Sequence, residues 1–373
     1  MRKMTVAACA IMAAAGTVLA ATAPDVKAAG SDVPPVVRDG KIGYVLTSRY
    51  WAVRESPNGK VECPNGFNDG PREQFKQLFD DGKKRTLLET QLMREGRQWF
   101  PDMSEEPFTF KEAGGPVSYG MNLDGKIGPE DFTDPDGVKG VDNQLFRAVG
   151  CVSQYRAPSN LIYFFENKYL GQYNNNRFMF EISGVDSLSN DDDVTVTTYR
   201  GLDDLLADAT GGSYVPGGTQ REDARWGKQF QQTFKGKIVN GVLVTDGEDL
   251  TLPSSATFDT NGVHKFKGLH FQLSLTPQRA EGIMAGYVDV AAFYHHLNTS
   301  WSTHHQSYGQ LSAPSLYRAL HRLADGYPDE KGEMTAISGA LKVTFTQVYI
   351  EHPPKQTADG GQAEKPATQS TRQ

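Results

Sequence analysis

The stretch Lys237-Ile238-Val239-Asn240-Gly241-Val242-Leu243-Val244 carries the strongest local signal for the fold. Asn-Gly accepts a positive φ at both central positions of a tight turn, and here it stands between two apolar runs rich in β-branched residues. The stretch therefore predicts an antiparallel hairpin that turns at Asn240 and Gly241.

Strand patterns of the same kind extend outward from this hairpin. Apolar residues alternate with polar ones, which is the period of a strand buried on one face. The alternating apolar positions are Phe178, Phe180 and Ile182, then Val194 and Val196, then Phe271, Leu273 and Leu275, then Leu341, Val343 and Phe345. Val348 and Ile350 resume the last pattern one residue out of step, which predicts a β-bulge between them and Phe345.

Short strands with one apolar face, not regularly followed by helices, predict a mainly β fold. We expect a β-sandwich, of the jelly-roll or concanavalin-like kind, over residues 151–352. Residues 41–150 are expected to form a smaller N-terminal α+β region that includes the acidic loops. A small helical elaboration is predicted within it at 70–96, where Pro71 suits a first helical turn.

One helix is expected within the β region. Ser312 suits its N-cap and Pro314 its first turn, whereas Gly326 and Pro328 suit its end. The residues that would face the core recur at helical spacing, and they are Leu316, Leu320 and Leu323.

Both ends of the chain have the composition of segments outside a folded domain. Arg2 and Lys3 precede an Ala-rich, almost uncharged stretch that ends in small residues, and this pattern predicts a secretory signal over residues 1–23. Residues 24–40 are expected to be a flexible lead-in and residues 353–373 a disordered tail. No later run is long or apolar enough to span a bilayer. We therefore expect the mature protein in the periplasm or outside the cell.

Cysteine content and charge narrow the class of protein further. Cys9 lies within the predicted signal, which leaves Cys63 and Cys151 in the mature chain. An even pair in an oxidising compartment predicts one disulfide, with two free thiols as the alternative. The formal net charge is −7 and no basic stripe is present, so nucleic acid is not an expected partner.

Residues 122–143 are dense in side chains that carry oxygen. Calcium takes about six to eight oxygen ligands, which a short loop supplies from alternating side chains and a carbonyl. The candidate calcium ligands are Asn122, Asp124, Asp131, Asp134, Asp136, Asp142 and Asn143. The alternative is that Asp, Asn and Gly serve here only as turn-forming residues.

The first part of this segment resembles the calcium loop of EF-hand and dockerin modules. The matching positions are Asn122, Asp124, Gly125, Ile127 and Asp131. The resemblance implies that the three polar side chains bind the ion together with the Lys126 carbonyl. It departs at the first position of the loop, where Gly120 stands instead of Asp.

The second part, Asp134-Pro135-Asp136-Gly137 followed by Asp142-Asn143, resembles a calcium loop of thrombospondin type 3 repeats. Those repeats occur in arrays, whereas one short copy is present here. The chain as a whole resembles bacterial exported proteins of unestablished biochemistry, and this resemblance implies no particular function.

Histidines gather towards the C-terminal end of the chain. His295-His296 and His304-His305 form two adjacent pairs, and Asp289 offers a nearby carboxylate. Imidazoles at this density can bind zinc, copper or iron, or supply a general base. Adjacent side chains on a strand point to opposite faces, so one histidine of each pair would reach a common site. The alternative is that these are surface or packing residues.

Three functions remain open. The first is an exported, calcium-stabilised β-sandwich that binds a glycan or an envelope protein. The second is a secreted hydrolase or transition-metal enzyme built on the His-rich segment 295–305. The third is a structural envelope protein. Residues 163–177 interleave aromatic and amide side chains, which suits either a sugar ligand or an exposed loop. No Gly-x-Ser-x-Gly or phosphate-binding motif favours an enzyme.

Overall fold

The hairpin around Asn240 and Gly241 is confirmed. The computed structural model describes residues 36–68, 93–94, 97–98, 110–156, 167–168, 170–171, 173–255, 262–299 and 313–354. β9 (Thr233–Val239) and β10 (Val242–Thr245) pair antiparallel across the turn. Asn240 has a φ of 51° and Gly241 a φ of 78°, so both adopt the left-handed conformation that this pair of residues tolerates.

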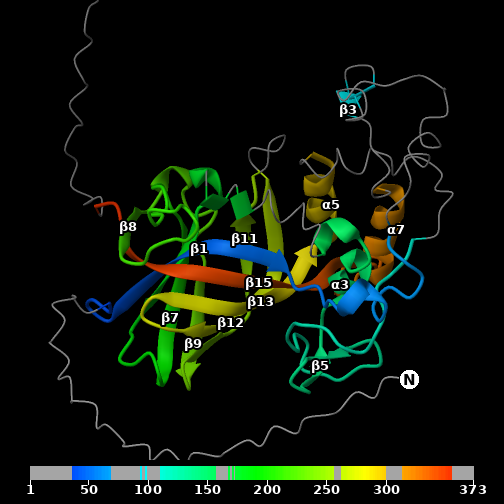
Figure 1. The fold of residues 1–373 in the computed structure, drawn as a ribbon, viewed down its shortest axis with the longest axis horizontal. Helices are drawn as coiled ribbons and strands as arrows, with labels where there is room; N and C mark the ends of the chain where they lie inside the picture. The colour runs from blue at the N-terminus through cyan, green and yellow to red at the C-terminus, as the bar shows by residue number, and fades with distance from the viewer. Residues whose placement is uncertain are drawn as a thin grey trace, which may run out of the picture. The chain divides into compact units, whose positions relative to one another are not determined.

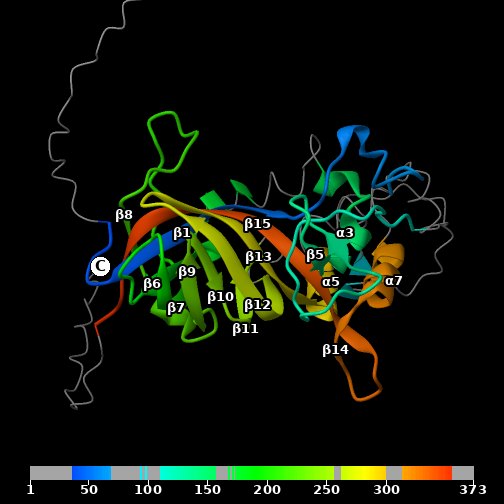
Figure 2. The same cartoon turned by 90° about the horizontal axis from the view of Figure 1, so that it is seen from below.

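Eight antiparallel strands of the described chain close into a β-barrel (Figures 1 and 2). Besides β9 and β10 these are β1 (Lys41–Trp51), β6 (Phe178–Ser183), β7 (Asp191–Arg200), β12 (Val263–Leu275), β13 (Arg279–Asp289) and β15 (Met334–Glu351). They follow one another as β1-β6-β7-β9-β10-β12-β13-β15, and β1 pairs with β15 from Gly43 opposite Val348 to Trp51 opposite Leu341. The predicted β-sandwich is therefore wrong, because a sandwich consists of two separate sheets and this sheet closes on itself.

Further strands extend or flank the barrel. β11 (Glu248–Pro253) pairs with β12, β14 (Gly326–Pro328) pairs with β15, and β8 (Gly218–Arg221) pairs in parallel with β15. Two small pairs are β2 (Met93–Arg94) with β3 (Arg97–Gln98), and β4 (Phe132–Thr133) with β5 (Lys139–Val141). Short 3₁₀ helices cover Pro57–Gly59, Ser153–Tyr155, Asn174–Asn176 and Ala224–Trp226.

Aromatic side chains fill the barrel interior. The ring of Phe180 lies 5.3 Å from that of Tyr44, 5.6 Å from Phe271 and 4.8 Å from Phe345, measured between centroids. These rings belong to four different strands, so the alternating apolar positions meet inside the barrel as expected for a strand buried on one face.

The outer face of β15 explains the change of phase seen near its end. Val348 packs in a separate apolar cluster with Val45 and Met179, outside the main core. The pairing of β15 with β13 and β1 continues without an extra residue in β15. The predicted bulge before Val348 is therefore wrong, because a second, outward-facing apolar cluster produced the change of phase.

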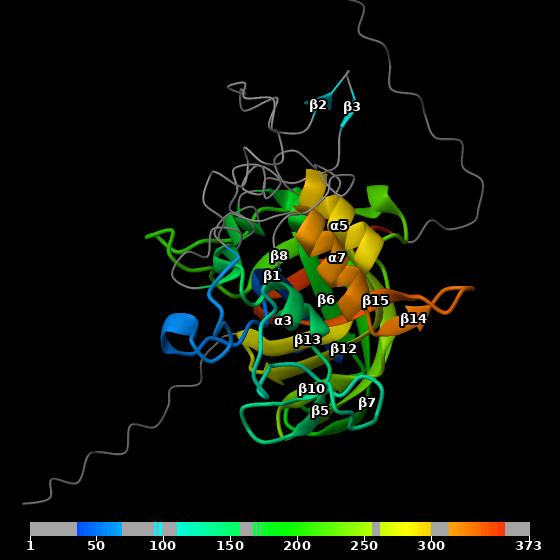
Figure 3. The ribbon, with the colours of Figure 1, turned by 90° about the vertical axis from the view of Figure 1, so that its right-hand side faces the viewer.

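Three α-helices of the described residues gather at one end of the barrel (Figures 1 and 3). They are α3 (Gln144–Val149), α5 (Val290–Thr299) and α7 (Ala313–Leu323). Leu316 and Leu320 of α7 are fully buried, which confirms the predicted helix. Most of the helix expected at 70–96 lies outside the described residues, and the two of its positions that are described, Met93 and Arg94, form strand β2. Among the described helices, none combines the length and apolarity needed to cross a membrane.

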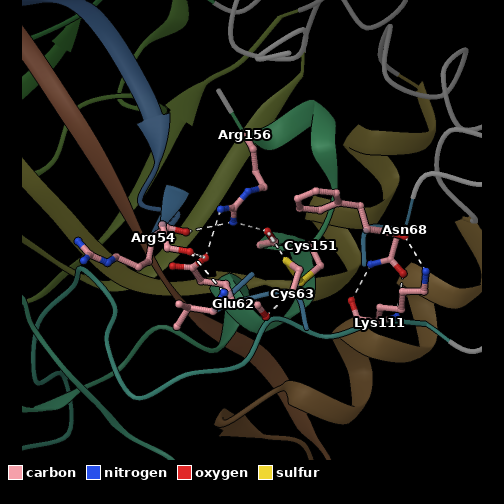
Figure 4. Close-up of a disulfide and its surroundings, with 11 residues drawn as sticks. Arg54, Glu62, Cys63, Asn68, Lys111, Cys151 and Arg156 are labelled. Carbon is pink, nitrogen blue, oxygen red and sulfur yellow. Dashed lines mark hydrogen bonds and ion pairs between the residues drawn. A yellow bond between two sulfur atoms is a disulfide. The ribbon is translucent and has the colours of Figure 1, made fainter. Parts of the chain in front are cut away.

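The predicted disulfide is confirmed. Cys63 and Cys151 are bonded, with their Cα atoms 5.6 Å apart (Figure 4). Arg156 fixes the neighbouring backbone, since its Nη1 donates to the Gly150 carbonyl at 2.7 Å and its Nη2 lies 3.5 Å from the Glu62 carboxylate. The bridge thus ties the segment that follows β1 to the segment that follows α3.

Candidate functional site

A β-bulge in β1 turns an arginine into the barrel. The pairing of β1 with β15 shifts register between Leu46 and Ser48, so Thr47 is the extra residue. Inward positions are even-numbered before the bulge and odd-numbered after it. Arg49 and Trp51 therefore point inward, and only 1% of the Arg49 surface is exposed.

The Arg49 guanidinium binds the end of β11. Its Nη1 donates to the Pro253 carbonyl at 2.9 Å, and its Nη2 donates to the Ser254 hydroxyl at 2.7 Å. Hydrogen bonds from a charged donor are stronger than neutral ones. The arginine therefore fixes the position of the Ser254 hydroxyl oxygen.

Two asparagines hold the backbone around this contact. Asn167 accepts from the Arg49 amide at 2.8 Å and donates to the Arg49 carbonyl at 3.1 Å. Asn176 donates to the Ser255 carbonyl at 2.8 Å and accepts from the Ser255 amide. Each side chain thus replaces a neighbouring strand at the end of β1 or β11. Asn176 is buried and occupied in this way, although the sequence of 163–177 also suited a sugar ligand.

Two histidines approach the same hydroxyl. The Ser254 Oγ lies 3.1 Å from Nε2 of His264, at the start of β12, and 3.3 Å from Nε2 of His296, on α5. Their ring centroids are 4.9 Å apart at an interplanar angle of 81°. The residue that follows β11, one residue of β12 and one of α5 therefore form a buried polar cluster with Arg49. We call these four residues the Ser254 cluster.

Hydrogen-bond counting assigns different roles to the two imidazoles. A hydroxyl has one hydrogen to donate and two lone pairs to accept with. Arg49 occupies one lone pair, so one imidazole Nε2 accepts the Ser254 hydrogen and the other donates an N–H to the remaining lone pair. The two rings therefore carry opposite tautomers when both are neutral.

Burial keeps His264 neutral. Desolvation, with smaller effects from His296 and Arg49, holds the pKa of His264 well below its usual value. Its Nδ1 has no hydrogen-bond partner among the described residues. The rings of Trp51 and Phe293 lie 5.4 Å and 5.8 Å from the His264 ring. The Ser254 cluster is thus enclosed by aromatic side chains, where electrostatic interactions are stronger than in water.

The predicted calcium loop at 122–131 is closed by its own hydrogen bonds. The side-chain oxygen of Asn122 accepts from the Gly125 backbone amide at 2.7 Å, and the side-chain NH₂ of Asn122 donates to the Lys126 backbone carbonyl at 2.7 Å. Asp124 accepts from the Lys126 amide at 2.8 Å. The Lys126 carbonyl, implied as a ligand by the EF-hand resemblance, here accepts from Asn122.

Asp142 brings part of the predicted calcium set together. Its carboxylate is buried and accepts from the Leu123 amide at 2.6 Å. Burial raises the pKa of Asp142 to about 6 against this hydrogen bond, and repulsion from Asp131 and Asp124 raises it further. Asp131 and Asp124, two other predicted ligands, therefore both lie close enough to Asp142 to repel its carboxylate.

The remaining predicted ligands have local roles. Asp134 accepts from the Asp136 and Val138 amides at 2.9 and 2.7 Å, within its own turn. Asn143 caps α3 by accepting from the Phe146 amide at 3.3 Å. In the part of the chain that the structure describes, no group of three or more His, Cys, Asp or Glu side chains is arranged to hold a metal ion. Calcium binding therefore stays a prediction.

The structure describes only part of the predicted histidine site. His295 and His296 lie on α5, not on a strand, and His295 is exposed whereas His296 is buried in the Ser254 cluster. His304 and His305 lie outside the described residues. Asp289 accepts from the Ala292 amide at 2.7 Å and so caps α5. Of the predicted histidine set, only His296 has a described place in the Ser254 cluster.

Sequence reasoning missed Arg49, Ser254 and His264. His264 alternates with Phe266 on β12, so its inward position could have been read from the strand period. Arg49 gave no such signal, because the bulge at Thr47 changes the phase. Comparison with family models, with curated proteins and with solved structures finds no match for this chain.

Proposed function

We propose that the chain is an exported binding protein whose barrel end receives a small anion, such as a carboxylate, at the Ser254 cluster. The supporting observation is the approach of Arg49, His264 and His296 to one buried hydroxyl. Buried charged networks are often no more stable than apolar packing of the same volume. His264, whose pKa is held well below its usual value by burial, lies in this cluster, and strongly shifted groups with polar partners are candidates for functional sites.

The donors of the cluster favour an anion over a cation. Arg49 only donates, and one imidazole must also donate towards Ser254. A carboxylate ligand that displaced the Ser254 hydroxyl from Arg49 would accept charge-assisted hydrogen bonds from the guanidinium. A metal ion at the same point would lie beside the positive charge of Arg49, 2.7 Å from the shared oxygen. Export is supported by the predicted signal and is compatible with the disulfide.

Calorimetric titration with acetate and benzoate tests this function. We expect binding to the wild type, and loss of binding in Arg49→Met, which removes the charge and keeps a similar buried volume. Arg279→Met is the matched control, because Arg279 is exposed on β13, away from the cluster. Absence of carboxylate binding to the folded wild type, or equal binding to both variants, would refute the proposal.

A second candidate function is hydrolysis with Ser254 as nucleophile. The 3.1 Å from its Oγ to the His264 Nε2 is within the reach of a general base. Proton transfer would, however, create a buried imidazolium beside Arg49, which is electrostatically unfavourable. A fluorophosphonate probe that labels the wild type and Ser255→Ala, but not Ser254→Ala, would establish the hydrolase and displace the binding function.

A further inference from the structure

The chain between β7 and β9 leaves the barrel wall over residues 202–222, which we call the excursion (Figure 2). Its strand β8 pairs in parallel with the end of β15 over only four residues. The Glu222 amide continues this pairing by donating to the Glu351 carbonyl at 2.9 Å. Parallel pairing is slightly less stable per residue than antiparallel pairing, so side-chain contacts matter for holding the excursion in place.

The excursion packs on apolar side chains of the outer face of the barrel. Val45, Met179, Tyr199 and Val348 form a buried group there, which we call the outer apolar cluster. Leu205 of the excursion packs against it. Movement of the excursion therefore changes how much of this apolar surface meets water.

His352, which follows β15, lies between two carboxylates. Its Nδ1 is 2.8 Å from the Glu222 carboxylate at the end of the excursion, and its Nε2 is 3.4 Å from the Glu181 carboxylate of β6. A neutral imidazole has one N–H, whereas both nitrogens of an imidazolium donate. Both contacts therefore form together only when His352 is protonated, and the imidazolium then links the excursion to the barrel wall.

The groups that surround His352 favour its protonated form. The hydrogen bond to Glu181 raises the pKa of His352; burial opposes this effect, and the hydrogen bond to Glu222 adds to it. The Tyr199 ring of β7 lies 4.8 Å from the imidazole ring, and Lys41 of β1 pairs with Glu181 at 2.8 Å. The other ionisable residues that line the hollow beside His352 are Arg38, Asp39, Tyr349 and Glu351.

Loss of the His352 proton leaves a ring lone pair facing a carboxylate. Glu181 is fixed in the barrel wall by the pairing of β6 with β1, and it keeps Lys41 as a partner. Glu222 belongs to the excursion, and within the described part of the chain no basic side chain other than His352 pairs with its carboxylate. The repulsion is therefore relieved by movement of the excursion, not of the wall.

We propose that His352 is a pH-sensitive latch, whose imidazolium holds the excursion against the outer apolar cluster and whose deprotonation releases it. The released state exposes more of the outer apolar cluster. The latch involves no residue of the Ser254 cluster, so neither proposal depends on the other.

Hydrogen exchange of the full chain, measured by mass spectrometry and corrected for the intrinsic pH dependence of exchange, reports this opening. Between pH 5 and pH 9, wild-type protection factors in 216–222 should fall roughly three- to tenfold, as expected for one partly exposed charged contact. Protection in the hairpin 233–245 should stay higher at every pH, because the opening is local. Equal protection in 216–222 at both ends of this range, or protection no lower there than in the hairpin, would overturn the latch.

Variants separate the latch from a general effect of pH. His352→Gln carries no titratable proton, so its protection in 216–222 should be low and independent of pH. Glu222→Gln removes the repelled carboxylate and should also reduce the pH dependence. His321→Gln is the matched control, because His321 is exposed on α7, and it should keep the wild-type profile. Thermal melting confirms that each variant is folded, and a wild-type pH profile in folded His352→Gln would refute the proposal.

Discussion

Replacing Asp142 with Asn should stabilise the metal-free protein at pH 7. The pKa of Asp142 is about 6 in the folded chain, against an ordinary value of 3.8. That difference of about two units corresponds to roughly 3 kcal/mol at about 1.36 kcal/mol per unit, which is an upper limit for the effect. The asparagine oxygen can still accept from the Leu123 amide, so the variant loses the charge and keeps this hydrogen bond.

The sign of the pH dependence follows from the raised pKa. The folded state binds the Asp142 proton more tightly than the unfolded state does, so the ionised carboxylate destabilises the fold above pH 6. The contribution of Asp142 to the free energy of unfolding of the wild type should therefore rise as pH falls through 6 towards 4. Asp142→Asn should lack this rise.

Calcium reverses the expected effect. A cation shared by Asp142, Asp131 and Asp124 would favour their charged forms and would stabilise the folded state by mass action. With calcium present, Asp142→Asn should then be less stable than the wild type. With a chelator, it should be more stable.

Urea unfolding at pH 5, 6 and 7, with calcium or with a chelator, measures both effects. Asp246→Asn is the control, because Asp246 is exposed, is not a predicted calcium ligand, and its carboxylate accepts no hydrogen bond from the described residues. Equal stabilities of wild type and Asp142→Asn under every condition would refute the electrostatic reasoning. A wild-type urea midpoint that is the same with calcium and with the chelator would refute only the calcium prediction.

Other properties of the fold can be tested in the same assay. Reducing the disulfide between Cys63 and Cys151, 88 residues apart, should cost roughly 4 to 5 kcal/mol on the chain-entropy model, and an unchanged midpoint in reductant would contradict this. His352→Gln should lose a contribution to the free energy of unfolding, which arises because the hydrogen bond to Glu181 raises the pKa of His352. That contribution is complete below about pH 6.5 and disappears as pH rises through the raised pKa, so a difference between the two proteins that grows with pH would refute it. Gly241→Ala should destabilise by about 1 kcal/mol because φ is 78°, and a neutral result in urea would show that the turn relaxes.

The features that the sequence predicted correctly depend on neighbouring residues. Asn240 and Gly241 determine their turn by backbone conformation alone, and Leu316 and Leu320 mark one face of α7 by their spacing. The choice between sandwich and barrel depends on a distant pairing. Thr47 donates to the carbonyl of Thr344, 297 residues away, and no local pattern carries that information. One-sided alternation is the same in both architectures.

The candidate site was harder to predict for a related reason. Arg49 is polar and its inward position requires the bulge, which depends on how β15 pairs with β1. His296 was interpreted as part of a strand, whereas α5 places it against His264 of β12. The acidic loops gave a strong local pattern, yet turns and a helix cap account for Asp134 and Asn143. Composition alone could not separate these roles from metal binding.

The pairing of β1 with β15 also sets the order of events during folding. Barrel strands from β1 to β13 can pair with their neighbours as they are synthesised. The barrel cannot close, however, until the residues up to Val348 are available. Until that moment, β1 and β13 each present an unpaired edge that can associate with another polypeptide. Such long-range closure is slow, so a nascent chain remains vulnerable to aggregation until its last barrel strand is synthesised.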